Sequence, residues 1–460
     1  MTDVNADTSV MKALKKIRTP QKQRNREFWL LLFSLAIAGA ALALVQLGAL
    51  KTIDPMILVI GGGLAVIVFA LHVVLRVVAS DADPFVLPIA TVLTGLGIAM
   101  IYRIDIAKNL TGWGAFSNKQ LAWTAISLAG AIALVIALRN YRVLYRFTYL
   151  SGLAGIVLLV LPFIPFLKAS GSNADVWVSI AGVFAFQPGE LAKICLAIFF
   201  AGYLVRTRES LSSVGHRFLG MTWPRMRELG PVLVVWVLSL LIIVTQRDLG
   251  TGLLIFGMFI AMLYVATGKT SWVLIGLVGV GVGAFFATQV LAYVQRRFTN
   301  WLDAFNPDII SAQGGSYQLV EGIFGLAHGG LIGTGWGQGR PHITPLSHSD
   351  YIIPSLGEEL GIVGLFAILC LYMVFVSRGL RIGLAGQDDF GKLLATGLSF
   401  TLALQVFIMV GGVTRVIPLT GLTTPFLAAG GSSLVANWLI VALLLRISDG
   451  VRRQPRVVIG

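Results

Sequence analysis

The sequence of residues 296–361 reads RRFTNWLDAFNPDIISAQGGSYQLVEGIFGLAHGGLIGTGWGQGRPHITPLSHSDYIIPSLGEELG and is the longest interruption between apolar runs in the chain. It contains three of the five histidines and a dense set of Asp, Glu and Arg side chains. A polar, glycine-rich segment of this length between spanning helices must lie outside the bilayer or line a wet cavity, because unpaired backbone groups cannot face lipid. This stretch is therefore the leading candidate for the functional site.

The composition around this stretch is that of a membrane protein. Charged residues make up 12% of the chain and hydrophobic residues 56%, and the mean hydropathy is +0.84. In soluble globular proteins about 25% of residues are charged. The composition therefore predicts an all-α, polytopic integral membrane protein. Cys195 and Cys370 each lie inside an apolar run, so the sequence indicates neither a disulfide framework nor a cysteine metal site.

The apolar runs predict about twelve membrane-spanning helices, since a helix needs about 20 residues to cross the hydrocarbon core. The seventh and eighth are short and are separated by TQRDLG (residues 245–250), so we expect a broken pair of helices there. The predicted spans cover residues 28–50, 56–78, 84–101, 121–138, 149–167, 191–205, 231–244, 250–267, 272–291, 352–376, 393–413 and 425–445.

The basic residues orient these spans. With residues 1–27 in the cytoplasm, most of the 35 Lys and Arg side chains fall in cytoplasmic segments, as the positive-inside rule requires. An even number of spans within a transmembrane domain of residues 28–447 places the basic tail 448–460 in the cytoplasm as well. Residues 296–351 then form a large extracytoplasmic loop before the tenth helix. The net charge of +14 is explained by this anchoring, and we expect no nucleic-acid binding.

Four unusual segments fall on the outer face in this topology, which predicts one site built from several loops. They are FQPGELAK (186–193), TQRDLG (245–250), the long stretch 296–361 and TRVIPLTGLTTPFLAAGGSS (414–433).

Glu190 and Lys193 stand three residues apart at the start of a span, and Asp248 begins another. Ionisable groups at membrane depth are costly and usually paired. One interpretation is a structural ion pair, either Glu190–Lys193 or Lys193–Asp248, that holds helices in register. The other is that Lys193 lines a cavity and binds an anionic group of a substrate. The two interpretations are compatible.

Asp303 and Asp308 follow Arg296 and Arg297 in the stretch WLDAFNPD. Carboxylates beside cations suit general-base catalysis on a substrate that carries phosphates. The alternative is a solvated turn, because Asn-Pro-Asp is itself a turn sequence. The pattern alone favours the turn.

His348, Asp350, Glu358 and Glu359 cluster before the tenth span. The spacing of His348 and Asp350 is too generic for a zinc motif, and no second histidine stands at ligand spacing on a helix. We therefore expect these four side chains to have structural roles, as caps and buried hydrogen-bonding groups. The glycines of residues 333–339 lack the strand–turn–helix context of a phosphate loop and are expected to allow tight turns and close backbone approach.

Taken in order, these segments resemble the motifs of the SEDS family (shape, elongation, division and sporulation), the membrane peptidoglycan glycosyltransferases RodA and FtsW. The resemblance covers residues 174–448, and the two additional N-terminal spans are most similar to actinobacterial RodA. The matching segments are FQPGELAK (family FQPSE..K), QRDLG (Q.DLG), SYQLVEG (GYQ..QS), GLIGTGWGQG (G..G.G.G.G), HSDYIIPSLGEELGIVG (HTDFIF..IGEELG..G) and IPLTGLTTPFLAAGGSS (P.TG..LPF.S.GGSS).

The resemblance implies a ten-helix core preceded by two further helices in the bacterial cytoplasmic membrane. It implies polymerisation of lipid II at the outer leaflet for cell elongation, in complex with a class B penicillin-binding protein and other elongation or division proteins. A division-type FtsW paralogue is one alternative. Another is a lipid II flippase, because intramembrane charges and broken spans are also typical of transporters. The gathering of unusual residues on one face favours the enzyme.

The resemblance also implies roles for individual residues. The family's loop aspartate corresponds most nearly to Asp308, after a one-residue shift in the spacing from Trp301, and Asp303 is the fallback; Ala304 replaces the family's proline here. In the first motif, Gly189 stands in place of the family's serine. The acceptor hydroxyl needs such a base. Cations and polar groups for the substrate and its diphosphate are expected at Arg296, Arg297, Lys193, Arg340, Tyr317 and Gln318. A divalent cation, Mg or Mn, would help to neutralise the diphosphate.

Overall fold

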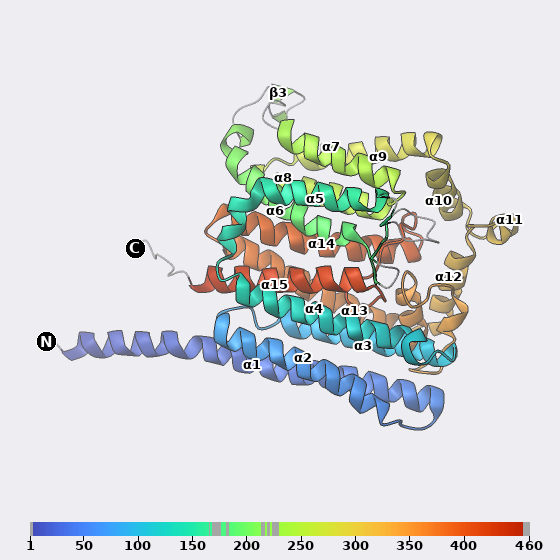
Figure 1. Ribbon diagram of the computed structural model, residues 1–460, viewed down its shortest axis with the longest axis horizontal. Helices are drawn as coiled ribbons and strands as arrows, with labels where there is room; N and C mark the ends of the chain where they lie inside the picture. The colour runs from blue at the N-terminus through green and yellow to red at the C-terminus, as the bar shows by residue number, and fades with distance from the viewer. Residues whose placement is uncertain are drawn as a thin grey trace.

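The computed structural model describes residues 3–164, 166–167, 176–180, 184–212, 217–218, 221–222 and 230–453. Among these residues, eleven helices are long and apolar enough to cross a membrane, and they pack side by side in one bundle (Figure 1). The prediction of a helical, polytopic membrane protein is confirmed. The only departures from an all-α chain in the described part are two small antiparallel ladders, β1–β2 and β3–β4.

The elements follow one another along the chain with short connections. The α-helices are α1 (Asp3–Leu50), α2 (Met56–Val78), α3 (Val86–Ala107), α4 (Phe116–Ala137), α5 (Thr148–Val160), α6 (Pro188–Ser212), α7 (Gly230–Thr245), α8 (Leu249–Thr267), α9 (Ser271–Val290), α10 (Ala292–Leu302), α11 (Pro307–Ser311), α12 (Tyr317–Gly329), α13 (Ile352–Ala385), α14 (Asp389–Val413) and α15 (Gly431–Arg453). The 3-10 helices include η1 (Gly112–Gly114), η2 (Tyr141–Phe147), η3 (Leu161–Phe163) and η5 (Pro341–Ile343), and the strands are β1 (Val178–Ile180), β2 (Phe184–Phe186), β3 (Arg217–Phe218) and β4 (Met221–Thr222).

The seventh predicted span corresponds to α7, which has 16 residues and carries a shorter apolar stretch, Val234–Thr245. The chain breaks between α7 and α8 as expected, with Arg247 at a positive φ of 61°. Asp248 then caps α8 by accepting a hydrogen bond from the Thr251 N–H (3.0 Å). The count of twelve spans remains a prediction, since α7 is below the length at which a helix crosses a bilayer unaided.

Helices α1 and α15 place the beginning and the end of the described chain at the same end of the bundle (Figure 1). Helix α1 runs without interruption through the basic segment that precedes the first predicted span, and its first turns project beyond the bundle (Figure 1). The short helices α10, α11 and α12 lie at the opposite end (Figure 1). The stretch 296–351, expected as a loop between spans, thus contains short helices joined by turns, and its position outside the membrane remains a prediction.

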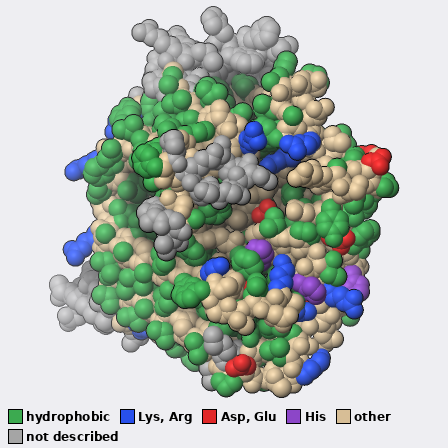
Figure 2. All heavy atoms as spheres, turned by 45° about the vertical axis from the view of Figure 1, so that its right-hand side comes forward, with side chains coloured by type: hydrophobic (Ala, Val, Ile, Leu, Met, Phe, Trp, Pro, Cys, Tyr) green, Lys and Arg blue, Asp and Glu red, His purple; other side chains and the backbone are tan. Residues whose placement is uncertain are grey.

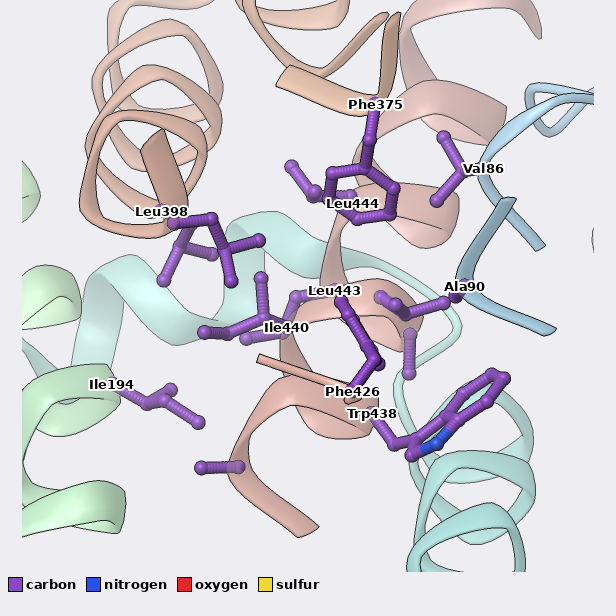
Figure 3. Close-up of a cluster of buried hydrophobic side chains, with 14 of the residues drawn as sticks. Val86, Ala90, Ile194, Phe375, Leu398, Phe426, Trp438, Ile440, Leu443 and Leu444 are labelled. Atoms are coloured by element: carbon purple, nitrogen blue, oxygen red, sulfur yellow. The ribbon is translucent and has the colours of Figure 1, made fainter. Parts of the chain in front are cut away.

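The core is formed by α3, α6, α14 and α15. The most apolar window of α3 is 94% buried, whereas that of α9 is 6% buried and leaves its apolar side chains at the bundle surface. Figure 3 shows side chains from α3, α6, α13 and α14 packed around those of α15, with Phe426 of the preceding loop among them. Phe426 and Trp438 pack edge to face with ring centroids 5.9 Å apart. This packing connects the 414–433 motif to the centre of the bundle.

Close contact at Gly97 provides a test of this packing. A Cβ added there would lie 2.4 Å from the Leu427 carbonyl oxygen, so Gly97→Ala should force the motif loop away from α3. We expect the free energy of unfolding to fall by about 1–3 kcal/mol, as for other overpacked cores. The measurement is the melting temperature of the purified protein in detergent.

The matched control is Gly62→Ala on α2, where an added Cβ meets no atom within 4 Å. Alanine favours a helix over glycine by about 1 kcal/mol, so this variant should melt no lower than the parent protein. Equal melting temperatures for the two variants would contradict the close approach of α3 and the loop.

Candidate functional site

The four motif segments meet at the end of the bundle where α10–α12 lie. The Gln187 N–H donates to Ser432 Oγ (2.8 Å), and Gln187 Nε2 donates to Asp248 Oδ2 (3.3 Å). Arg297 Nη1 donates to the carbonyl oxygen of Thr420 (2.8 Å). Figure 2 turns this end of the molecule forward and shows Lys, Arg and His side chains interspersed among hydrophobic ones. The segments that sequence analysis placed on one face are thus joined by hydrogen bonds.

A break in α13 shapes the centre of this face. Gly361 interrupts the helix with φ 68° and ψ −176°, and the Ile362 N–H donates instead to the Gly330 carbonyl oxygen (3.0 Å). The glycine-rich run lies directly against the break. A Cβ on Gly333, whose φ is 81°, would lie 2.2 Å from the Glu359 carbonyl oxygen. The glycines therefore permit tight turns and close backbone approach, and they satisfy backbone groups that the break leaves free.

Glu358 and Glu359 hold this glycine-rich run with their side chains. Glu358 Oε1 accepts from the Arg340 N–H (2.7 Å), and Glu359 Oε2 accepts from the Gly337 N–H (2.9 Å). Arg103 Nε of α3 donates to Glu359 Oε1 (2.9 Å), forming a buried ion pair. Arg103 was not among the site residues predicted from the sequence. A lone arginine near the end of a span suggests a buried ion pair, but the sequence does not identify the partner, Glu359, because it lies far along the chain.

Glu190 and Lys193 form a buried ion pair on α6, with Lys193 Nζ 2.6 Å from Glu190 Oε2. Their exposed fractions are 4% and 3%. Lys193 Nζ also donates to Gln405 Oε1 of α14 (3.1 Å). Of the two ion pairs considered, the structure has Glu190–Lys193. Asp248 interacts with Gln187 and with the Thr251 N–H instead. Lys193 therefore lies inside the bundle and already has a charged partner.

A cavity of about 530 Å³ opens among α10, α11, α12 and the 414–433 segment. Among the candidate residues, the structure places Arg297, Tyr317, Gln318 and Asp350 on its wall. Its further polar lining includes Asn300, Ser311 and Ser316, and its further aromatic lining includes Trp301 and Tyr351.

Burial in the cavity wall changes the acid–base properties of Asp350 and Arg297. Burial raises the pKa of the Asp350 carboxyl to about 6, against the opposing effects of a Ser349 hydrogen bond and the positive charge of Arg297. Burial also lowers the pKa of the Arg297 guanidinium, while the negative charges of Asp248 and Asp350 act to raise it. Titratable groups perturbed by burial and by a charge partner are typical of functional sites.

Asp303 and Asp308 lie outside this cavity wall and are exposed. Asn306 caps α11: its Oδ1 accepts from the Asp308 N–H (3.0 Å), and its Nδ2 donates to Asp303 Oδ2 (2.9 Å). The turn that the Asn-Pro-Asp sequence predicts is therefore present. Ile310 and Ser311 of the same short helix line the cavity, so Asp308 stands beside its rim.

Arg296 and Arg340 are also exposed on this face. Arg296 Nη1 lies 3.8 Å from the position of a Cβ added to Gly314, which is part of the cavity wall. Arg340 is fixed through its backbone N–H by Glu358. Neither guanidinium is buried, so both are open to a solvent-borne anion.

His348 packs as a structural side chain. Its ring stacks on Phe116 with centroids 3.9 Å apart, and its carbonyl oxygen accepts from the Ala429 N–H (2.8 Å). Burial, reinforced by the positive charge of Lys108, lowers the pKa of His348 to about 4, so the imidazole is neutral at physiological pH.

The oxygen and nitrogen ligands near the cavity do not match those that a divalent cation requires. In the part of the chain that the structure describes, no group of three or more His, Cys, Asp or Glu side chains could hold a metal ion. Asp350 lines the cavity without a second carboxylate and shares it with the cation Arg297. Magnesium and manganese prefer several oxygen ligands. These residues do not by themselves form a divalent-cation site.

Comparison with known proteins adds to this geometry. A family model described as FTSW_RODA_SPOVE, cell cycle protein, matches residues 84–453. The chain belongs to the FtsW/RodA/SpoVE family. It is 43% identical over 438 residues to peptidoglycan glycosyltransferase RodA of Mycobacterium tuberculosis, which covers 94% of this chain and 92% of that protein. RodA of Mycobacterium leprae is 42% identical over 441 residues, with the same coverage of both chains.

The division-type relatives are more distant. A probable peptidoglycan glycosyltransferase FtsW of Geobacter sp. (strain M18) is 31% identical over 377 residues, which is 80% of this chain and 97% of that protein. The mycobacterial matches cover more of the chain than residues 84–460 contain, so they extend into the N-terminal helices α1 and α2. The two added helices are thus shared with RodA of mycobacteria.

Solved structures support the fold. One similar chain comes from a structure titled "Structural coordination of polymerization and crosslinking by a peptidoglycan synthase complex". It matches with a TM-score of 0.63 and 22% identity, covering 81% of this chain and 99% of that one. RodA of Thermus thermophilus matches with a TM-score of 0.53 and 22% identity, covering 81% and 98%. At this level of identity the likeness is one of fold.

The buried pair Arg103–Glu359 generates a test of the site's support. Arg103→Gln leaves a buried carboxylate without its cation, and breaking such a pair costs about 3–5 kcal/mol. We expect a lower melting temperature and faster proteolysis within residues 330–340. Adding Glu359→Gln to this variant should recover part of the loss, because no unpaired charge then remains.

The control for this test is Arg208→Gln, which breaks an exposed pair with Asp389 (2.6 Å, both side chains 45% exposed). Exposed pairs contribute about 0–1 kcal/mol, so this variant should melt close to the parent protein. An Arg103→Gln protein as stable as the Arg208→Gln protein would show that Arg103 does not hold the glycine-rich run.

Proposed function

We propose that this chain is a RodA-type peptidoglycan glycosyltransferase that polymerises lipid II into glycan strands at the outer face of the cytoplasmic membrane. The observation that carries the proposal is the meeting of four motif segments at one end of the bundle, where two of them line a cavity, in a chain 43% identical to mycobacterial RodA over 94% of its length. The more distant FtsW relatives favour a role in elongation over one in division.

The chemistry requires a base and a set of cations. The sugar hydroxyl of the acceptor attacks the anomeric carbon of the donor, a new glycosidic C–O bond forms, and the donor's bond to its polyprenyl diphosphate breaks. A carboxylate accepts the hydroxyl proton, and positive groups stabilise the departing diphosphate. We assign the base to Asp308, with Asp303 as the fallback. Its support is its position on α11, which also lines the cavity.

The cations proposed for the diphosphate are Arg296, Arg297, Lys193 and Arg340. Their placement favours the exposed pair Arg296 and Arg340, because an anion can reach them without breaking an existing interaction. Lys193 is buried and paired with Glu190, so its charge would act on the diphosphate from a distance and not by direct contact. Tyr317 and Gln318, on the cavity wall, would contact the sugar.

The proposed assembly follows from the same assignment. A class B penicillin-binding protein would cross-link the glycan, alongside other elongation or division proteins. The similar chain from a peptidoglycan synthase complex supports a partner of this kind. Both termini are proposed to be cytoplasmic, which the common end of α1 and α15 and the basic residues favour.

The decisive experiment supplies the purified protein with lipid II in detergent and measures glycan polymer. We expect polymer without any other enzyme. Asp308→Ala should reduce the rate by at least about a hundredfold, the lower range of a general base, while membrane insertion and melting temperature stay unchanged. The control is Asp389→Ala, which removes an exposed carboxylate at the start of α14, away from the cavity. This variant should polymerise lipid II normally.

Two outcomes would change the proposal. Near-normal rates for Asp308→Ala, together with loss in Asp303→Ala, would move the base to Asp303. Lipid II movement across liposome membranes without any polymer would support a transporter and overturn the glycosyltransferase.

A further inference from the structure

Helix α1 precedes residues 84–453, which the family model matches, yet it packs along α3 from the first turn of α3 to its last turns (Figure 1). At one end of this contact, Ser34 Oγ donates to the Pro88 carbonyl oxygen (3.0 Å). At the other end, the fully buried Gln46 donates from Nε2 to the Tyr102 hydroxyl (3.1 Å). Helix α1 is therefore an integral part of the bundle.

The last turn of α1 reaches the glycine-rich run of residues 333–339. A Cβ added to Gly48 would lie 2.0 Å from the Trp336 carbonyl oxygen and 2.9 Å from the Gly337 Cα. The contact is reciprocal, because a Cβ added to Gly337 would lie 2.7 Å from the Ala49 backbone nitrogen. The two backbones thus touch with no side chain between them, which requires glycine on both sides.

Helices α3 and α13 hold the same run through hydrogen bonds. Arg103 Nη2 of α3 donates to the Gly339 carbonyl oxygen (2.7 Å), and Glu358 Oε1 of α13 accepts from the Arg340 N–H (2.7 Å). Gly337 and Gly339 are buried, whereas Arg340, the next residue, is exposed. The guanidinium of Arg340 therefore extends from a backbone whose path α1, α3 and α13 set together.

We propose that α1 is a positioning element of the site, in which the contact between Gly48 and Gly337 fixes the glycine-rich run so that Arg340 presents its guanidinium to the diphosphate of the substrate. The inference rests on the proposed function, where Arg340 is one of the cations for that group, and it adds a contribution from the N-terminal helices. Gly48 acts through the run and not on the substrate, so it is a positioning residue.

A contact between two backbones has the stiffness that positioning needs. A side chain at this place could change rotamer, whereas a backbone inside a packed bundle cannot. Ordinary contact with a Cβ begins at 3.4 Å, so a methyl group on Gly48 would displace the run by about 1 Å or more. A displacement of about 1 Å in a group that acts on the reacting atoms can cost up to about a hundredfold in rate.

The first test compares Gly48→Ala with Gly39→Ala in the full-length protein in nanodiscs, by hydrogen exchange of the peptide that covers residues 333–340. Both glycines lie on α1, but a Cβ added to Gly39 meets no atom within 4 Å. We expect exchange to rise about fivefold or more in Gly48→Ala, the factor for one lost hydrogen bond, and to stay unchanged in Gly39→Ala. Equal exchange in the two variants would overturn the role of α1.

The second test asks whether Gly48 acts through Arg340. The rate of lipid II polymerisation at saturating substrate is measured for Gly48→Ala, Arg340→Gln and the double variant. We expect Gly48→Ala to be about tenfold slower than the parent protein, and the double variant to be no slower than Arg340→Gln, because no guanidinium remains to be misplaced. A general loss of stability would instead multiply the two effects. Multiplied effects would therefore overturn the proposal.

A milder pair of variants keeps the proposal testable if Gly48→Ala does not fold. Tyr102→Phe removes the hydroxyl that pairs with Gln46, beside the glycine-rich run, whereas Ser34→Ala removes a hydrogen bond at the far end of the same helix pair. Exchange across residues 333–340 should rise in Tyr102→Phe and not in Ser34→Ala. The same exchange in both variants would show that α1 does not hold the run.

The two measurements also separate this proposal from the proposed function. Parent protein that makes no polymer overturns the glycosyltransferase, while faster exchange in Gly48→Ala still supports the hold of α1 on the run. Parent protein that polymerises lipid II, with a rate and an exchange profile that Gly48→Ala leaves unchanged, overturns the role of α1 alone.

Discussion

The break in α13 at Gly361 is the constraint on which the face at the α10–α12 end of the bundle depends. A helix that stops hydrogen bonding to itself within a membrane protein must find partners for the freed backbone groups, because lipid offers none. Here the glycine-rich run supplies them, and the Glu359 side chain and Arg103 hold that run in place. The helical turns before the break carry Glu358 and Glu359, and Asp350 directly precedes them. One interruption of a helix thus fixes the glycine-rich run against the start of α13, next to Asp350 and Tyr351 of the cavity wall.

The charged side chains on this face fall into two groups, buried ion pairs and exposed arginines. The two most deeply buried cations on this face each have a carboxylate partner: Lys193 is paired with Glu190, and Arg103 with Glu359. Burying a charge without a partner is costly, so these side chains stabilise the bundle and are poorly available to substrate. The exposed arginines carry no such constraint. Electrostatics therefore separates groups that hold the site together from groups that can meet an anion.

Sequence reasoning succeeded where the signal is local. Apolar runs identify the spans, and TQRDLG identifies the break between α7 and α8, because hydrophobicity and helix caps depend on near neighbours. It failed where tertiary contacts decide. The sequence placed a loop between spans after α9 but did not predict the short helices α10 and α12 within it. The position of α10 depends on long-range contacts such as the hydrogen bond from Trp301 Nε1 to the Arg415 carbonyl oxygen (3.0 Å). The pairing of Arg103 with Glu359 could not be predicted for the same reason, because the two residues lie 256 positions apart in the sequence.

Asp350 illustrates how position outweighs pattern in assigning a site. In sequence it stands between His348 and a span, in a motif that suggested only support for the chain's return into the membrane. In the fold it shares a cavity wall with Arg297 of α10, a helix that begins at Ala292, far earlier in the sequence. A carboxylate kept in a desolvated wall is unfavourable for stability unless something else requires it. The place of Asp350 in the cavity wall therefore follows from the fold and could not be predicted from its neighbours in the sequence.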